Sequence, residues 1–88
     1  MILIWNKRSW EQYLWWQAQD RKMVKRINAL IADIARNGNE GLGKPEPLRN
    51  EFSGYWSRRI TSEHRLIYQI TADETEIRIA ACRYHYES

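Results

Sequence analysis

The sequence contains a single cysteine, Cys82, among its 88 residues. An intramolecular disulfide is therefore excluded, which fits a reducing compartment. Long apolar runs are also missing, and the N-terminal stretch 2–5 is too short for a signal peptide or a membrane span. We therefore expect a cytoplasmic protein without a membrane segment, in which Cys82 is a small core residue.

Several catalytic motifs are absent as well. The two histidines, His64 and His85, stand far apart and do not have the spacing of zinc or two-metal ligands. The sequence has no glycine-rich phosphate loop of the Walker type and no nucleophile elbow. It therefore predicts no bound metal and no cofactor.

Glycine and proline are scarce outside one segment. Three of the four glycines and both prolines lie in residues 38–48, which excludes a helix or an interior strand there. This segment reads as a loop that separates a helical half from a strand half. Strands are predicted after it, near residues 55–61, 64–71 and 76–83.

Capping signals before the loop predict two helices. Asn6 and Ser9 are both candidate N-caps for a helix over about residues 7–19. Asp20 is a good N-cap for a second helix, which residues 37–38 (Asn-Gly) end. The apolar stripe of this second helix has helical spacing and comprises Met23, Ile27, Leu30, Ile31 and Ile34.

These elements predict a single α+β domain over residues 1–88, in the order β-α-α-β-β-β. Two helices would pack on one face of an antiparallel sheet. A hydrophobic content of 43% and five tryptophans indicate a globular chain. Trp10 is predicted to lie in the core, whereas the adjacent Trp15 and Trp16 cannot both do so.

The last third of the chain concentrates arginine, aromatic and histidine side chains. The net charge of +3 is mild, so the clustering says more than the total. Arginine forks bind phosphate, aromatic faces stack bases, and histidine can move a proton near neutral pH. This combination indicates a surface for single-stranded RNA with a capacity for acid–base chemistry.

Two residues in this half could carry chemistry. Glu46 lies between Pro45 and Pro47, which restrict the backbone and preorganise its carboxylate. The alternative is an ordinary solvated loop glutamate. Arg65 begins a strand whose alternation places it on the face opposite Leu66, although it could equally be a surface arginine.

Strand parity leaves three further assignments open. Arg58 and Arg59 are adjacent and point to opposite faces, so only one of them can share a site with Arg65, and parity does not settle which. His85 is in phase with the predicted core positions of the last strand and can reach an open face only if a bulge or bend intervenes. His64 is better explained as a structural residue.

Four segments together resemble the YoeB (Txe) branch of the RelE-type bacterial toxins. They are residues 43–48 (GKPEPL), 52–61 (FSGYWSRRIT), 63–68 (EHRLIY) and 80–86 (AACRYHY). The resemblance implies a microbial-RNase-like α+β fold and an endoribonuclease that cleaves mRNA in the A site of the 70S ribosome, with contacts to both subunits. It also implies a YefM-type antitoxin partner, and it leaves a homodimer open.

The resemblance also implies roles for individual residues. Glu46 would be the general base, Arg65 would stabilise the phosphate, His85 would be the general acid and Tyr86 would order the site. The residues that would hold the RNA are Lys44, Arg49, Arg59 and Tyr84.

The chain departs from the family pattern in its last hairpin, which looks longer than usual, and in Glu87 and Ser88, which follow the usual final His-Tyr pair. Two other functions remain compatible with the residues. One is a noncatalytic RNA- or ribosome-binding module, and the other is a protein-interaction domain whose aromatic side chains bury against a partner.

Overall fold

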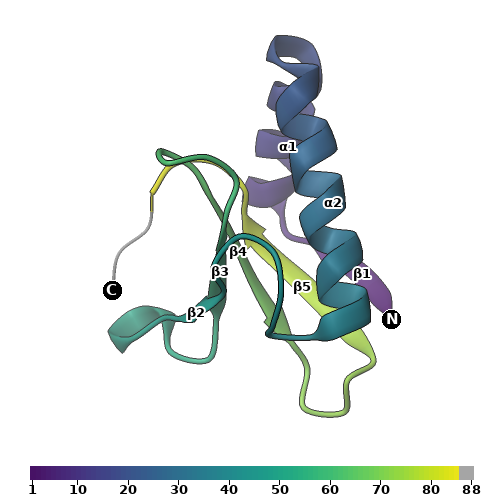
Figure 1. Cartoon of the computed structure of the whole chain (residues 1–88), viewed down its shortest axis with the longest axis vertical. Helices are drawn as coiled ribbons and strands as arrows, with labels where there is room; N and C mark the ends of the chain where they lie inside the picture. The colour runs from purple at the N-terminus through teal and green to yellow at the C-terminus, as the bar shows by residue number, and fades with distance from the viewer. Residues whose placement is uncertain (86–88) are drawn as a thin grey trace.

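The computed structural model describes residues 1–85. Within these residues, two helices cover one face of a five-stranded sheet, and the other face is turned away from them (Figure 1). The strands are β1 (Ile2–Trp5), β2 (Glu46–Pro47), β3 (Trp56–Arg59), β4 (Arg65–Ile70) and β5 (Glu76–Ala81), arranged in the order β1-β5-β4-β3-β2. The helices are α1 (Lys7–Gln19) and α2 (Arg21–Asn37), and a short 3₁₀ helix, η1, spans Asn50–Phe52.

Local capping explains why both helices begin and end where the sequence predicts. Asn6 caps α1, and its side chain accepts a hydrogen bond from the backbone of Ser9, whose hydroxyl accepts one from the backbone of Asn6 in return. Ser9 is therefore the third helical residue and not the cap. Asp20 caps α2, and Gly38 ends it with a positive φ of 66°.

The α+β class is confirmed, but the sheet is mixed and not wholly antiparallel. β1 pairs in parallel with β5. This is possible because α1 and α2 carry the chain from β1, at one edge of the sheet, to β2 at the opposite edge before the other strands form. The remaining strand pairs are antiparallel. The proline-rich loop adds the short edge strand β2, which agrees with the exclusion of an interior strand.

The core lies between the helices and the sheet, and it contains the predicted stripe of α2. Ile27, Leu30 and Ile34 are fully buried there. Trp16 is the buried tryptophan of α1, but the prediction for Trp10 is wrong. Trp10 lies 45% exposed beside β1, which is an edge strand of the sheet formed by residues 1–85. Among residues 1–85, neither helix is long and apolar enough to cross a bilayer.

Cys82 is a core residue, as predicted, and is fully buried. Burial raises the pKa of its thiol to about 12. The thiol therefore stays protonated at neutral pH and offers no reactive thiolate.

Candidate active site

The structure settles which of the two adjacent arginines shares a face with Arg65. Arg58 points into the protein and is fully buried, whereas Arg59 is exposed. Arg59 lies directly opposite Arg65 in the register of β3 and β4, so both belong to the sheet face away from the helices. Like charges placed opposite each other disfavour a sheet, and an anion between them would relieve the repulsion.

Arg58 is the centre of a buried polar cluster beneath the loop 38–44. Its Nη1 donates to Oδ2 of Asp33 at 2.7 Å and to the carbonyl of Leu42 at 2.8 Å. Its Nη2 donates to the carbonyls of Gly38 and Glu40 at 2.7 and 3.0 Å. The guanidinium thus binds one carboxylate and three loop carbonyls, and this fastens the loop to α2.

Asp33 completes this cluster from the helix side. Hydrogen bonding to Arg58, helped by the Leu42 amide, lowers the pKa of Asp33 to about 2, so the carboxylate is ionised at neutral pH. Gly41 approaches so closely that a Cβ atom there would overlap the Asp33 carboxylate. Gly41 also has a φ of 118°, which side-chain-bearing residues rarely adopt. The loop sequence is therefore adapted to the buried charge pair.

We expect Arg58→Met to lower the free energy of unfolding by about 3–5 kcal/mol, because it leaves the Asp33 carboxylate buried without a cation. Urea denaturation followed by tryptophan fluorescence measures this loss. Arg59→Met is the matched control, because its exposed side chain should change stability by no more than about 0.5 kcal/mol. Equal losses in the two variants would show that Arg58 does not anchor the loop.

Glu46 lies at the edge of the same sheet face. In β2 it pairs with Ser57 of β3, and Arg59 follows two residues later on that face. Diagonal neighbours of this kind are about 7–8 Å apart. The backbone amide of Leu48 donates to the carbonyl of Tyr55 at 2.9 Å and holds the short hairpin in register. The exposed carboxylate of Glu46 is therefore carried on the sheet and not on a loose loop.

Arg65 lies at the start of β4 and is only 8% exposed. Its Nη1 donates to the carbonyls of Thr61, Ser62 and His64 at 2.8, 3.2 and 3.2 Å. The guanidinium is therefore held against the turn between β3 and β4. This gives a cation of defined position on the open face, next to the exposed Arg59.

The chain bends after β5 and brings the C-terminal segment to the start of β4. The register of β4 and β5 shifts at a bulge between Ile67 and Tyr68, and Tyr84 adopts a left-handed φ of 71°. His85 is exposed, and a bulge and a bend of the kind that strand parity required for it both precede it in the structure. The amide of Arg65 donates to the carbonyl of Tyr84 at 2.8 Å. Because His85 is the next residue after Tyr84, its backbone starts close to that of Arg65. Figure 1 shows this end of the chain passing from β5 toward the turn between β3 and β4.

The remaining predicted residues flank this arrangement. Lys44, Arg49 and Tyr84 are exposed, and Lys44 has a positive φ of 51° just before Pro45. Tyr86 lies outside the described residues. Within residues 1–85, no three His, Cys, Asp or Glu side chains gather as ligands for a metal ion.

A family model described as the YoeB-like toxin of bacterial type II toxin–antitoxin systems matches residues 5–86. The chain belongs to this family. It is 58% identical over 86 residues to toxin YoeB of Escherichia coli K12, covering 98% of this chain and all of that one.

Solved structures of YoeB toxins agree with this membership. A YoeB/ParE toxin from Agrobacterium tumefaciens superposes with a TM-score of 0.94 at 46% identity, over 98% of this chain and 100% of that one. YoeB of Staphylococcus aureus, solved as a dimer and in complex with YefM, gives TM-scores of 0.90 and 0.89 at 46% and 45% identity, over 98% of each chain. This chain therefore has the RelE/YafQ-like fold of the YoeB toxins.

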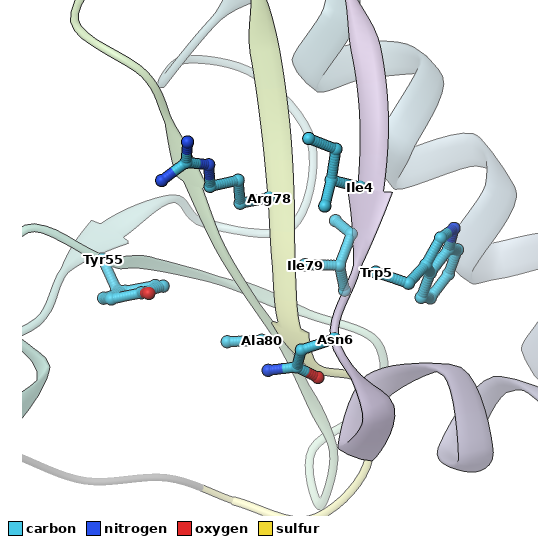
Figure 2. A pocket seen from close by; sticks show the side chains of 7 residues that line it. All are labelled: Ile4, Trp5, Asn6, Tyr55, Arg78, Ile79 and Ala80. Carbon is cyan, nitrogen blue, oxygen red and sulfur yellow. The ribbon is translucent and has the colours of Figure 1, made fainter.

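A hollow elsewhere on this YoeB-like toxin is lined by none of the predicted site residues that the structure describes. It lies by β1 and β5, and Figure 2 shows Arg78 and Tyr55 on one side of β5 and Trp5 on the other, beside the helices. Arg78 is paired with Glu76 at 2.9 Å. We therefore assign no catalytic role to this hollow.

Sequence reasoning missed two parts of the toxin's site architecture. Asp33 could have been found from the sequence, because it lies beside Ile34 on an apolar helix face. A carboxylate buried there needs a cation to pair with it. Arg83 gave no such signal. Its guanidinium stacks on the ring of Trp15, 3.5 Å from the centroid, and lies 4.5 Å from that of Tyr84. Only the tertiary structure brings these three together.

Proposed function

We propose that this YoeB-like toxin is a ribosome-dependent endoribonuclease that cleaves mRNA in the ribosomal A site and so stops translation. The observation that carries the proposal is a carboxylate and two arginines on one face of the sheet, with a histidine next in sequence to a residue that is hydrogen-bonded to one of these arginines. Glu46, Arg59 and Arg65 share that face by strand register. The carbonyl of Tyr84 accepts a hydrogen bond from the amide of Arg65, and the exposed His85 follows Tyr84 in the chain.

The proposed reaction uses the 2′-hydroxyl of the RNA as its nucleophile, so a metal is not required. Glu46 takes the 2′-hydroxyl proton while the 2′-oxygen attacks phosphorus. Arg65 stabilises the charge that develops on the phosphate oxygens. The bond to the 5′-oxygen breaks, and protonated His85 gives its proton to that oxygen. The products are a 2′,3′-cyclic phosphate and a 5′-hydroxyl.

The other residues support this reaction by holding the substrate. Lys44, Arg49 and Arg59 are exposed cations that can bind the RNA backbone, and the exposed ring of Tyr84 can stack on a base. Tyr86 is proposed to order the site. Residues 1–88 would act as one cytoplasmic domain.

Two macromolecular partners follow from the proposal. The ribosome presents the mRNA, and a YefM-type antitoxin would neutralise the toxin. The complex of the Staphylococcus aureus toxin with YefM supports this second partner. The dimer of that same toxin supports testing whether this chain self-associates.

Primer extension on mRNA bound to programmed 70S ribosomes tests the proposal. The purified toxin should produce one dominant break in the A-site codon, and the downstream fragment should carry a 5′-hydroxyl that polynucleotide kinase can label. Binding to ribosomes without any break would instead support the noncatalytic module.

Arg65→Lys should lower the single-turnover cleavage rate by about 10–10³-fold, although it preserves the charge. Nη1 of Arg65 already donates to carbonyls of the turn. Lysine lacks the planar guanidinium that could bind these carbonyls and a phosphate at the same time. Arg78→Lys is the matched control, because Arg78 lies by the other edge of the sheet and is paired with Glu76. A rate within threefold of wild type for Arg65→Lys would mean that the guanidinium geometry is not used.

A further inference from the structure

The segment Cys82–Tyr84, here called the C-terminal clip, is hydrogen-bonded to the rest of the protein at both of its ends. The amide of Cys82 donates to Oε1 of Gln12 at 2.7 Å, and Nε1 of Trp16 donates to the carbonyl of Cys82 at 2.9 Å. At its other end, the amide of Tyr84 donates to Nδ1 of His64 at 2.8 Å. The clip therefore depends on a side chain that the proposed chemistry does not use.

The hydrogen bond from Tyr84 defines the protonation state of His64. An Nδ1 atom that accepts a hydrogen bond carries no proton, so the neutral ring bears its proton on Nε2. Protonation would turn Nδ1 into a donor facing another donor. Of its two backbone hydrogen bonds, Tyr84 would then keep only the one that its carbonyl accepts from the amide of Arg65.

The surroundings of His64 favour the neutral ring. Burial lowers its pKa from 6.5, and the nearby cations Arg83 and Arg65 lower it further, while Glu63 acts in the opposite direction. The ring also packs edge-on against Trp16, with centroids 4.9 Å apart. Arg83 is held near by its stacking on Trp15.

We propose that His64 is a positioning residue for the cleavage reaction, and that its Nδ1, by accepting the Tyr84 amide, holds His85 beside Arg65. This inference rests on the proposed function for its catalytic consequence. His64 touches neither the RNA nor the reacting atoms in this role. It sets the backbone from which the general acid projects.

Two substitutions test whether His64 acts by accepting this hydrogen bond or by the size and charge of its side chain. His64→Asn places Oδ1 close to where Nδ1 lies, so it can accept the Tyr84 amide and does not titrate. His64→Leu fills similar space without an acceptor. Glu74→Gln, in the distant turn between β4 and β5, is the control for handling and charge.

Single-turnover cleavage of ribosome-bound mRNA at pH 7.5 should fall about 10–10²-fold in His64→Leu, because a misplacement of about 1 Å can cost about 10²-fold. His64→Asn should stay within threefold of wild type, and the affinity of all variants for the programmed ribosome should be unchanged. Circular dichroism establishes that each variant is folded. Full activity in folded His64→Leu, or equal losses in both variants, would overturn the inference while leaving the proposed function intact.

The amide proton of Tyr84 gives a second readout that does not depend on activity. In an His85→Ala background, which removes the neighbouring imidazole, its chemical shift should move upfield as pH falls through the titration of His64. It should stay downfield at every pH with His64→Asn and upfield with His64→Leu. A Tyr84 amide chemical shift that is the same in wild type and in both His64 variants would refute the proposed role of His64. Absence of cleavage by the wild type would instead refute the proposed function.

Discussion

Glu46→Gln is expected to lower the single-turnover cleavage rate by about 10²–10⁴-fold, the usual contribution of a general base. Glutamine keeps the shape of the side chain and cannot accept the 2′-hydroxyl proton. The pairing of Glu46 with Ser57 uses backbone groups, and the flanking prolines remain, so β2 should be unchanged. The rate is measured with excess toxin on mRNA in programmed ribosomes.

Glu51→Gln is the matched control for this change. Glu51 is an exposed glutamate of η1, close in sequence to Glu46 but outside the hairpin pairing. It should cleave at the wild-type rate, since the same loss of charge there removes no base. A wild-type rate in Glu46→Gln would remove Glu46 from the mechanism, and equal losses in both variants would point to electrostatics of the surface in general.

Deleting Tyr84 to Ser88 is expected to abolish detectable cleavage, with a loss of at least about 10²–10⁴-fold. The deletion removes the proposed acid His85 together with Tyr84 and Tyr86, which would stack on the RNA and order the site. The fold should survive, because β5 ends at Ala81 and the core is built from residues before Arg83. Circular dichroism and single-turnover cleavage measure the two outcomes.

Deleting only Glu87 and Ser88 should leave cleavage equal to wild type or raise it. That deletion removes a carboxylate that would compete with RNA phosphate for the same arginines. The two truncations thus have opposite expectations in one assay. Cleavage by the longer deletion would show that His85 is not the acid, and inactivity of a folded shorter deletion would reveal a role for the last two residues.

The helices show what short-range signals can predict. Both helices have the predicted bounds because a cap is decided by a few neighbouring residues, such as Asn6 with Ser9 and Asp20 with Lys22. The ambiguity between Asn6 and Ser9 arose because a capping box uses both side chains in exchange. The burial of Trp10 was mispredicted because helical spacing does not reveal that α1 covers the edge of the sheet.

The candidate site shows where such signals stop. The sequence indicated Glu46, Arg65 and His85 by residue type, flanking prolines and resemblance. It could not choose between Arg58 and Arg59, since alternation only says that they face opposite sides. The choice depends on Asp33, 25 residues away, whose buried carboxylate draws Arg58 inward and leaves Arg59 on the open face.

The sequence by itself determined the helices, the loop 38–48 and the kinds of chemistry that the strand half can perform. These follow from caps, prolines and side-chain type, which act within a few residues. Only the tertiary structure decided that β1 lies parallel to β5 and that His64 accepts the Tyr84 amide. Such contacts join residues far apart in the chain, and their free energy is gained only when the whole sheet and its helices pack together.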